Sequence, residues 1–279
     1  MTEGAARLAV LGSPIAHSKS PALHRAAYAA LGLDWSYDAI EVSEGGLSAF
    51  LNDVDASWRG LSLTMPLKRE VLPLLDERTA LVDQVGAANT VLLSEGRKQG
   101  FNTDVAGVVG ALGDAGVTSL EYVQVLGAGA TAASVLAASA QLGATRVLVS
   151  ARDPEKAQSL EPVAAALGID LTIRPIGMTD RSMIVPSAVI STLPAGTPID
   201  VPFPEQIRAQ SVLLDVAYEP WPSELASSWT DAGGAVVSGL AMLLHQAVAQ
   251  VRIFVTGDER GALQREAEVV AAMRSAVGL

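Results

Sequence analysis

The segment Val125-Leu126-Gly127-Ala128-Gly129-Ala130-Thr131-Ala132 decides the fold of the second half of this chain. An apolar run precedes its two glycines and an alanine-rich run follows them, which predicts a strand, a tight turn and a helix. A turn of this composition lets the pyrophosphate of a dinucleotide approach the N–H groups of the helix N-terminus. The alternative is a purely structural turn, but a second strand ending at Ser150 provides the context that a dinucleotide site requires.

Strand and helix patterns alternate on both sides of this segment. The alternation favours an α/β fold with parallel sheets wound through βαβ units, and two sets of strands indicate two lobes. The expected strands span residues 7–11, 35–42, 60–64 and 90–94 in the first set, and 122–126, 146–150, 171–174, 188–192, 212–215 and 236–237 in the second. The expected helices span residues 21–31, 67–75, 77–85, 104–115, 130–142, 154–167, 240–255 and 260–277. Ser20 is expected to be the N-cap of the first helix.

The composition excludes several classes of function. The chain has 279 residues, 49% of them hydrophobic, which is enough for one large or two medium domains. Its net charge of −11, with no basic tract, argues against nucleic acid as a partner. The absence of cysteine excludes disulfides, thiolate catalysis and cysteine-ligated metals. The three histidines, His17, His24 and His245, lack the spacing of a metal site, and we expect no metal.

The distribution of apolar residues indicates where in the cell the protein is expected. The first four residues, Met1 to Gly4, lack the basic residues of a secretory signal, and the apolar run 8–11 is too short for one. The most apolar stretch, 233–251, contains Ser238 and Gln246, so we expect a buried helix and the strand before it rather than a membrane span. A cytoplasmic protein is the expectation.

The residues after the second strand of the dinucleotide motif indicate whether the cofactor is NAD or NADP, because they lie beside its ribose. A carboxylate at this place usually binds both ribose hydroxyls of NAD, but here Ser150-Ala151 is followed by Arg152. Arg152 is in reach of a 2′-phosphate and Lys156 lies one turn into the next helix, so the sequence favours NADP. The alternative is a pair of solvated basic side chains, and Asp153 would partly oppose a phosphate.

The N-terminal third carries groups that suit chemistry at an alcohol. The loop Gly12-Ser-Pro-Ile-Ala-His-Ser-Lys-Ser-Pro21 offers three hydroxyls to a polyhydroxylated or carboxylated ligand, although simple helix capping would also explain them. Lys68 and Asp104 each follow a β-rich run and together offer an ammonium and a carboxylate. Such a pair can move a proton at a secondary alcohol, and beside a nicotinamide it would serve hydride transfer. A solvated lysine and a helix-capping aspartate are the alternatives.

Ordered motifs along nearly the whole chain resemble those of the shikimate dehydrogenase family. They are Gly12–Pro21, Thr64–Lys68, Ala88-Asn89-Thr90, Asn102-Thr103-Asp104, Ser191–Pro194, Asp215–Pro220 and the segment from Gly239 to Ala247. The chain departs from the family pattern where Gly-Ala-Gly-Gly-Ala-x-Arg has become Gly127-Ala-Gly-Ala-Thr-Ala-Ala133, and where Asn-Arg-Thr has become Ala151-Arg-Asp153. A third departure is Arg25, which stands where an asparagine is common.

The resemblance implies an activity and a domain plan. It implies NADP-dependent, reversible reduction of 3-dehydroshikimate to shikimate, on the route to chorismate and the aromatic amino acids. Residues 1–103 and 240–279 would form the substrate domain, with the C-terminal helices returning to it, and residues 104–239 would form a Rossmann-like NADP domain. A homodimer and a monomer both stay open. The rival functions are quinate or aminoshikimate dehydrogenase, a generic hydroxyacid dehydrogenase and a non-catalytic NADP-binding regulator.

The resemblance also implies roles for individual residues. Lys68 and Asp104 would be catalytic and contact the hydroxyl that is oxidised. Ser18 and Ser20 would bind the carboxylate of shikimate. The ring and hydroxyls would be held by Thr64, Asn89, Tyr218 and Gln246. The NADP-binding residues would be Gly127, Ala128, Gly129, Ala130, Thr131, Ala151, Arg152, Lys156, Thr192, Val216 and Gly239.

Overall fold

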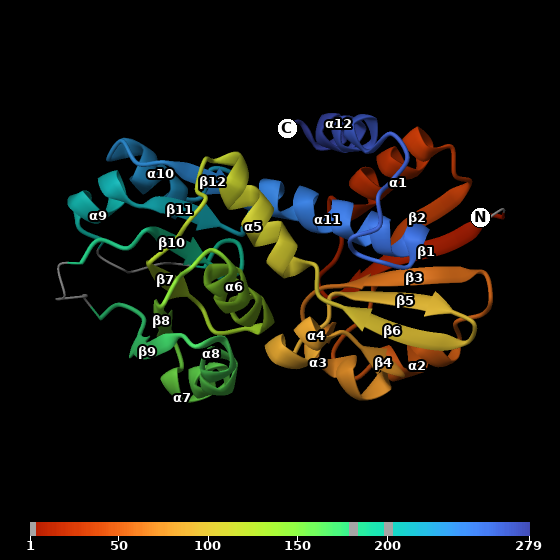
Figure 1. Cartoon of the computed structure of the whole chain (residues 1–279), viewed down its shortest axis with the longest axis horizontal. Helices are drawn as coiled ribbons and strands as arrows, with labels where there is room; N and C mark the ends of the chain where they lie inside the picture. Colours follow the sequence, from red (N-terminus) through yellow and green to blue (C-terminus); the bar gives the residue numbers. More distant parts are fainter. Residues whose placement is uncertain (1–3, 179–183, 198–202) are drawn as a thin grey trace. The chain divides into compact units, whose positions relative to one another are not determined.

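The chain folds into two compact α/β units, and the computed structural model describes residues 4–178, 184–197 and 203–279 (Figure 1). One unit comprises Met1–Thr103 with Leu243–Leu279, and the other comprises Asp104–Met242. The second crossing between the units falls after Met242, inside a helix, rather than after residue 239. Which ligand each unit binds stays a prediction at this point.

The first unit contains a mixed six-stranded sheet in the order β2-β1-β3-β5-β6-β4. Its strands are β1 (Ala6–Gly12), β2 (Trp35–Glu41), β3 (Trp58–Leu63), β4 (Glu77–Arg78), β5 (Thr90–Ser94) and β6 (Arg97–Phe101). β1 runs parallel to β2 and β3, whereas β5 runs antiparallel to β3 and β6. The sheet of this unit is therefore mixed, whereas the alternation of strands and helices alone argued for parallel strands. Glu95 and Gly96 turn β5 into β6 with φ values of 52° and 73°, as a tight hairpin requires.

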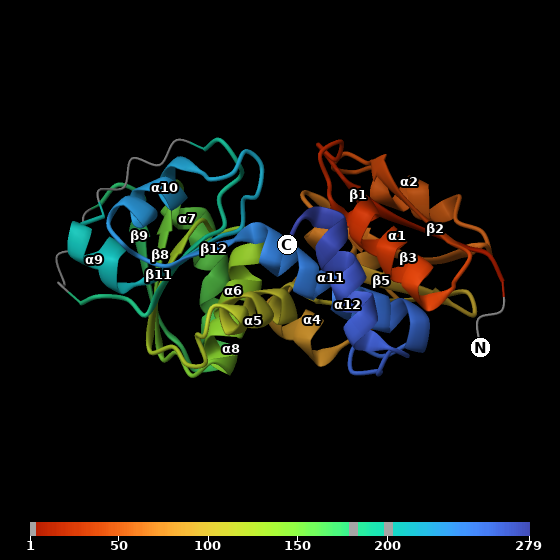
Figure 2. The same ribbon diagram turned by 90° about the horizontal axis from the view of Figure 1, so that it is seen from above.

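Helices on the first unit frame the sheet. They are α1 (Ser20–Leu31), α2 (Leu47–Asn52), α3 (Leu67–Glu70), α4 (Ala80–Val85) and α12 (Glu266–Val277), and α3 continues into the short 3-10 turn η1 (Leu72–Leu74). α1 and α12 lie side by side, although they come from opposite ends of the sequence (Figure 2). Two expected boundaries were wrong. Glu77 and Arg78 form a short strand because they pair with β6, and residues 260–265 lie outside α12.

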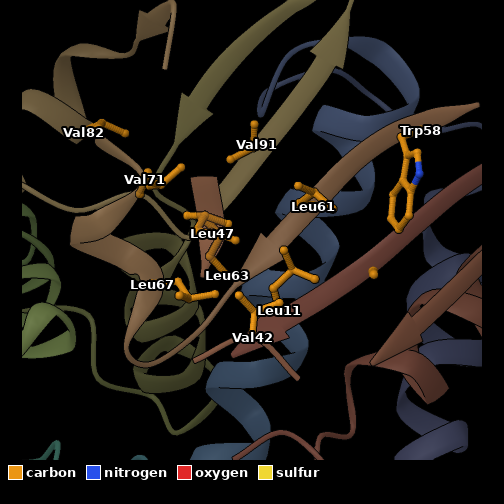
Figure 3. Packing of buried hydrophobic residues seen from close by; sticks show 12 residues of the cluster. Leu11, Val42, Leu47, Trp58, Leu61, Leu63, Leu67, Val71, Val82 and Val91 are labelled. Carbon is orange, nitrogen blue, oxygen red and sulfur yellow. The ribbon is translucent and has the colours of Figure 1, made fainter. Parts of the chain in front are cut away.

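The core of the first unit anchors the α3 turn. Leu11 and Leu61 come from β1 and β3, and both are fully buried. Figure 3 shows Leu67 and Val71 among the same cluster of buried side chains. Burying one such side chain contributes about 1.5–3 kcal/mol, so Leu67 and Val71 hold the turn between them firmly against the sheet.

The second unit contains a fully parallel sheet in the order β12-β11-β10-β7-β8-β9. Its strands are β7 (Tyr122–Leu126), β8 (Arg146–Ala151), β9 (Asp170–Pro175), β10 (Ala188–Ser191), β11 (Val212–Asp215) and β12 (Val236–Ser238). Its helices are α5 (Asp104–Asp114), α6 (Ala130–Gln141), α7 (Pro154–Ala157), α8 (Glu161–Leu167), α9 (Glu205–Gln210) and α10 (Glu224–Asp231), with the 3-10 turn η2 (Gln158–Leu160). The strand order reverses between β7 and β10, which is where open parallel sheets bind ligands.

The apolar stretch near the C-terminus forms β12 and the long helix α11 (Gly239–Thr256). By length and composition α11 is the one described helix that could cross a membrane, but 61% of it is buried inside the structure. Gln250 on this helix is 3% exposed and its amide hydrogen-bonds to β5. α11 is thus a core helix with polar residues on its buried side.

Candidate active site

The serine loop and the lysine turn of the first unit are joined by their backbones. The N–H of Ser13 donates to the carbonyl of Met65 at 3.0 Å, and the N–H of Thr64 donates to Leu11 at 2.9 Å. Gly12 permits this approach, because a Cβ there would lie 2.3 Å from Cγ2 of Thr64 and 2.8 Å from the Met65 carbonyl oxygen. The carboxyl ends of β1 and β3 therefore bring two sequence motifs to one place.

The two candidate serines differ in what their hydroxyls do. The α1 helix begins at Ser20 with Lys19 as its N-cap, so the expected capping by Ser20 was wrong. Ser18 accepts a hydrogen bond from the backbone N–H of Ser20 at 3.3 Å, and no side chain caps the helix. Ser20 is 7% exposed, and its hydroxyl has no partner within the described residues. Both serines can therefore donate a hydroxyl proton to a ligand, because Ser18 only accepts in its described hydrogen bond.

The backbone of Lys68 is held by the packing of its neighbour Leu67 and by a hydrogen bond. Lys68 lies in α3 directly after Leu67, which is fully buried, and is itself 9% exposed. Its carbonyl accepts the N–H of Ala88 at 2.8 Å, which ties the lysine turn to the segment that leads into β5. The ammonium group is therefore carried by a rigid backbone rather than by a surface loop.

Asn89 is the centre of the polar cluster in the first unit. Its Oδ1 accepts the backbone N–H of Thr103 at 2.8 Å, so its other amide atom is the donor Nδ2. Nδ2 donates to Oε1 of Gln246 at 2.9 Å and to the hydroxyl of Thr103 at 2.9 Å. Asn89 thereby brings together residues from β5, from the end of β6 and from α11.

The remaining candidate residues for substrate lie around this cluster or in the second unit. Thr64 belongs to the lysine turn, one residue after β3. Asp104 directly follows Thr103, whose N–H and hydroxyl are held by Asn89, and it is the first residue of α5. Tyr218 lies in the second unit, just after β11, and is half-buried. Covalent linkage to Thr103 fixes where the Asp104 backbone begins.

The glycine turn of the second unit has the geometry of an anion site. Gly127 ends β7 with φ 101°, and a Cβ there would lie 2.5 Å from Oγ1 of Thr192. Gly129 is the N-cap of α6, and no side chain caps that end of the helix. The N–H groups that open a helix need partners, and the residues Ala128 to Thr131 are at least partly accessible. A pyrophosphate fits this end of α6 and benefits from the helix dipole.

The other candidate cofactor residues follow β10 and β11. Thr192 donates its hydroxyl to the carbonyl of Leu126 at 2.9 Å, which links the ends of β10 and β7. Val216 follows β11, and Gly239 opens α11. A Cβ on Gly239 would lie 2.0 Å from the carbonyl oxygen of Val216, so only glycine allows the two backbones to meet. The expected cofactor residues thus line the carboxyl ends of the central strands.

Arg152 and Lys156 are both exposed, but only one of them is engaged. Asp153 caps α7 by accepting the N–H of Lys156 at 3.1 Å, and its carboxylate lies 3.7 Å from Nζ of Lys156. The expected opposition of Asp153 to a phosphate is therefore lessened, since its charge is turned to Lys156 and the helix end. Arg152 has no partner within the part of the chain that the structure describes. Its guanidinium is available to a 2′-phosphate after β8.

Several polar residues that motif analysis did not single out support the cluster. His24 on α1 and Gln250 on α11 are buried, and Nε2 of His24 lies 3.1 Å from Oε1 of Gln250. The His24 ring stacks on Tyr37 with 4.0 Å between the ring centres. Burial lowers the pKa of His24 from 6.5 to about 3, against a smaller opposing effect of its hydrogen bond to Gln250. His24 is therefore neutral in the folded protein, as expected for a packed histidine.

His24 should make the folded protein sensitive to acid. Unfolded, it takes up a proton below pH 6.5, whereas the folded protein resists this down to about pH 3. Its contribution to stability is thus complete above pH 6.5 and is lost as the pH falls from there toward 3. At one pKa unit per 1.36 kcal/mol, about 2 kcal/mol is lost between pH 7 and pH 5.

Urea unfolding of the wild type and of His24→Gln at both pH values measures this loss. The stability advantage of the wild type should shrink by about 2 kcal/mol at pH 5. The exposed His17→Gln variant is the matched control and should keep the full acid sensitivity of the wild type. If the wild type were more stable than His24→Gln by the same free energy of unfolding at both pH values, His24 would not be a buried neutral histidine.

Comparison with known proteins gives a consistent set of relatives. Residues 10–91 match the family model described as the shikimate dehydrogenase substrate binding domain. A shikimate dehydrogenase (NADP(+)) of Ignicoccus hospitalis is 33% identical over 250 residues, which cover 88% of this chain and 92% of that protein. The crystal structure of Mycobacterium tuberculosis shikimate dehydrogenase is similar with a TM-score of 0.83 and 38% identity, covering 97% of this chain and 99% of that one. The Thermus thermophilus shikimate 5-dehydrogenase in complex with NADP(H) and shikimate has a TM-score of 0.80 and 32% identity, with coverage of 97% and 99%.

Proposed function

The chain belongs to the shikimate dehydrogenase family, and we propose from this premise that it interconverts 3-dehydroshikimate and shikimate with NADP. It is an NADP-dependent oxidoreductase that acts on a CH–OH group. The observation that carries the proposal is the Asn89 cluster, which joins Gln246 and Thr103 in the same unit as Lys68. The glycine turn with its uncapped helix in the other unit supports NADP as the cofactor.

The first unit would bind shikimate through groups of complementary chemistry. The free hydroxyl of Ser20, with Ser18 beside it, would hold the carboxylate. The hydroxyls on the ring are donors and acceptors, and they suit Thr64, Asn89 and Gln246. Tyr218, whose phenol both donates and accepts, would be a further residue for the ring hydroxyls.

Lys68 and Asp104 would handle the proton. NADPH, when bound, supplies the hydride that reduces the carbonyl carbon of 3-dehydroshikimate. The Lys68 ammonium stabilises the negative charge that develops on the carbonyl oxygen and gives up a proton to it. Asp104 orients the lysine and the hydroxyl and shares the proton. In the oxidation direction the same groups remove the hydroxyl proton from shikimate.

The second unit would hold NADP at the carboxyl ends of β7, β8, β10 and β11. The pyrophosphate would lie at the N-terminus of α6, over Gly127–Thr131, with Ala151 at the end of β8. Thr192, Val216 and Gly239 would lie near the nicotinamide. Arg152 and Lys156 would face the 2′-phosphate, with Arg152 as the principal contact because Lys156 already pairs with Asp153.

The Arg152→Ala variant tests the choice of NADP. A charge-assisted hydrogen bond to phosphate is worth about 1.5–3 kcal/mol, so the KM for NADP should rise about ten-fold to a hundred-fold. The KM for NAD should hardly change, because NAD has no 2′-phosphate. Steady-state kinetics with both cofactors measure the difference, and Lys156→Ala is the matched control with a smaller expected effect. An equal effect of Arg152→Ala on both cofactors would mean that Arg152 does not contact the 2′-phosphate.

A spectrophotometric assay in four pairings tests the proposed function. Shikimate and quinate are each combined with NADP and NAD, and reduced cofactor is followed over time. The shikimate–NADP pair should give the highest kcat/KM. Turnover of quinate with NAD, without turnover of shikimate, would assign the chain to the rival dehydrogenase, and no turnover in any pair would favour a non-catalytic regulator.

We also propose which partners the protein has and where in the cell it acts. The substrate is a small molecule, and the net charge of −11 opposes binding to nucleic acid. We expect action in the cytoplasm, where a biosynthetic enzyme meets its NADP pool, without a membrane partner. Sedimentation of the purified protein decides between the monomer and the homodimer that the sequence leaves open.

A further inference from the structure

A continuous set of buried hydrogen bonds in the first unit leads from α1 to Gln246. It begins at Tyr28 and His24, one turn apart on α1, and continues through Gln250 on α11. It then passes through Thr90 to Asn89, whose amide holds Gln246. Gln246 and Gln250 are themselves one turn apart on α11, so the chain of contacts leaves the helix and returns to the same face.

Backbone groups fix the direction of these hydrogen bonds at Gln250. The Nε2 of Gln250 lies 3.3 Å from the backbone carbonyl oxygen of Asn89, which can only accept. The opposite atom of the amide is therefore Oε1, and it faces His24 at 3.1 Å and the hydroxyl of Ser62 at 2.9 Å. Tyr37 donates to Ser62 at 2.7 Å, so Ser62 in turn donates to Gln250.

The tautomer of His24 follows from that assignment. Because Oε1 of Gln250 is an acceptor, the Nε2 atom of His24 must carry the proton. The Nδ1 atom then accepts from the hydroxyl of Tyr28, which lies 3.1 Å away. The low pKa of His24 and the raised pKa of Tyr28, both caused mainly by burial, keep each group in the protonation state that this arrangement needs.

The same direction continues on the far side of Gln250. Its Nε2 donates to the Thr90 hydroxyl at 3.1 Å, and Thr90 donates to Oδ1 of Asn89 at 2.9 Å. A backbone N–H, that of Thr103, confirms Oδ1 as the acceptor, so Nδ2 of Asn89 donates to Oε1 of Gln246. Each donor thus points along the chain from Tyr28 to Gln246. The Nε2 of Gln246 has no partner within the described residues.

We infer that His24, Gln250 and Thr90 are positioning residues, which act through Asn89 to set the amide of Gln246 with its NH₂ group toward the ligand. The inference deepens the proposed function and rests on it. It specifies that the shikimate atom beside Gln246 is a hydrogen-bond acceptor, because Gln246 offers a donor. A flipped Gln246 amide would set its NH₂ group against the Nδ2 donor of Asn89, and two donors that face each other are costly in a buried network.

Nitrogen NMR of the wild-type protein tests the direction without any assay. With only three histidines in the chain, the His24 signals are assigned from the spectrum of His24→Gln. The expected result at neutral pH is a neutral ring with the proton on Nε2 and a bare Nδ1. A proton on Nδ1, or a ring that is charged at neutral pH, would overturn the inference whatever the enzyme turns over.

The pair Thr90→Val and Thr90→Ser tests the positioning role. Valine has the shape of threonine without the hydroxyl, so Gln250 loses one of its two acceptors and Asn89 loses one donor. One hydrogen bond is worth about 0.5–1.5 kcal/mol, so the KM for shikimate should rise about three-fold to ten-fold. The kcat and the KM for NADP should stay within about two-fold of the wild type, and serine should restore the KM.

The outcomes separate this inference from the proposed function. A wild-type enzyme that is active on shikimate, with an unchanged KM in Thr90→Val, would overturn the positioning role alone. A wild type without activity on shikimate would overturn the proposed function. Thr172→Val, on the exposed side of β9, is the matched control and should leave the KM unchanged. Loss of thermal stability in Thr90→Val without a change in KM would mark Thr90 as merely structural.

Discussion

Lys68→Met is expected to lower kcat by about 10²–10⁴, the usual scale for the loss of a positioned acid or base. Methionine keeps the length and the apolar stem of the side chain, so Leu67 and the α3 turn should stay in the core. The affinity for shikimate should change much less, because Ser20, Asn89 and Gln246 remain. Single-turnover kinetics with NADPH and 3-dehydroshikimate measure the chemical step apart from product release.

A control and a double variant sharpen this test. Lys98→Met removes a lysine that pairs with Asp76 on the surface of the same unit, and its kcat should stay within about two-fold of the wild type. Asp104→Asn should also be slow, and Lys68→Met with Asp104→Asn should be little slower than the slower single variant, since groups that act together lose their effect together. Multiplicative losses, or a near-normal chemical step in Lys68→Met, would show that the proton travels by another route.

Gly12→Ala is expected to lower both stability and activity, because the new side chain displaces the backbone of the turn that carries Lys68. The new Cβ would lie 2.3 Å from Cγ2 of Thr64 and 2.8 Å from the carbonyl oxygen of Met65. The Thr64 side chain can rotate, but the carbonyl belongs to the turn that carries Lys68, so the turn must shift. Overpacking of this kind costs about 1–3 kcal/mol of stability. Displacing a catalytic group by about 1 Å can cost about 10²-fold, so kcat/KM should fall by about that factor.

Urea unfolding and steady-state kinetics of Gly12→Ala measure both effects. Gly113→Ala is the matched control, because a Cβ at Gly113 would meet nothing within 4 Å. The control should be at least as stable as the wild type, since alanine is the better helix former. A Gly12→Ala enzyme with normal kcat/KM would mean that the contact between the serine loop and the lysine turn does not position Lys68.

The fold could be predicted where local pattern and tertiary structure agree. The glycine turn at Gly127 and the strands around it were placed correctly, because the inner strands of an all-parallel sheet are buried on both faces and appear in the sequence as continuous apolar runs. The antiparallel hairpin to β6 was not predicted, since Arg97, Lys98 and Gln99 give that strand a polar pattern. The turn between β5 and β6 holds Glu95 in a left-handed conformation, and a glutamate in the sequence does not predict such a conformation.

Some parts of the candidate site could likewise be predicted from the sequence, and others could not. Lys68, Asp104 and the glycine turn could be proposed as site residues because each belongs to a motif that is contiguous in sequence. The supporting hydrogen bonds were not predicted, because they join residues that are far apart: Gln250 meets Thr90 across 160 positions, and His24 across 226. The helix α1 begins at Ser20 with Lys19 as its N-cap, one residue earlier than expected, and pattern alone does not resolve a shift of one residue.

Transfer of deuterium from NADPH tests whether the protein reduces 3-dehydroshikimate by hydride transfer. The purified protein is incubated with 3-dehydroshikimate and NADPH that carries deuterium at both C4 positions of the nicotinamide, and the product is analysed by NMR and mass spectrometry. We expect shikimate with one deuterium on the carbon of the former carbonyl, formed at a rate that Lys68→Met lowers by about 10²–10⁴. Unlabelled shikimate, or no shikimate at all from a folded protein that binds NADPH, would contradict this expectation.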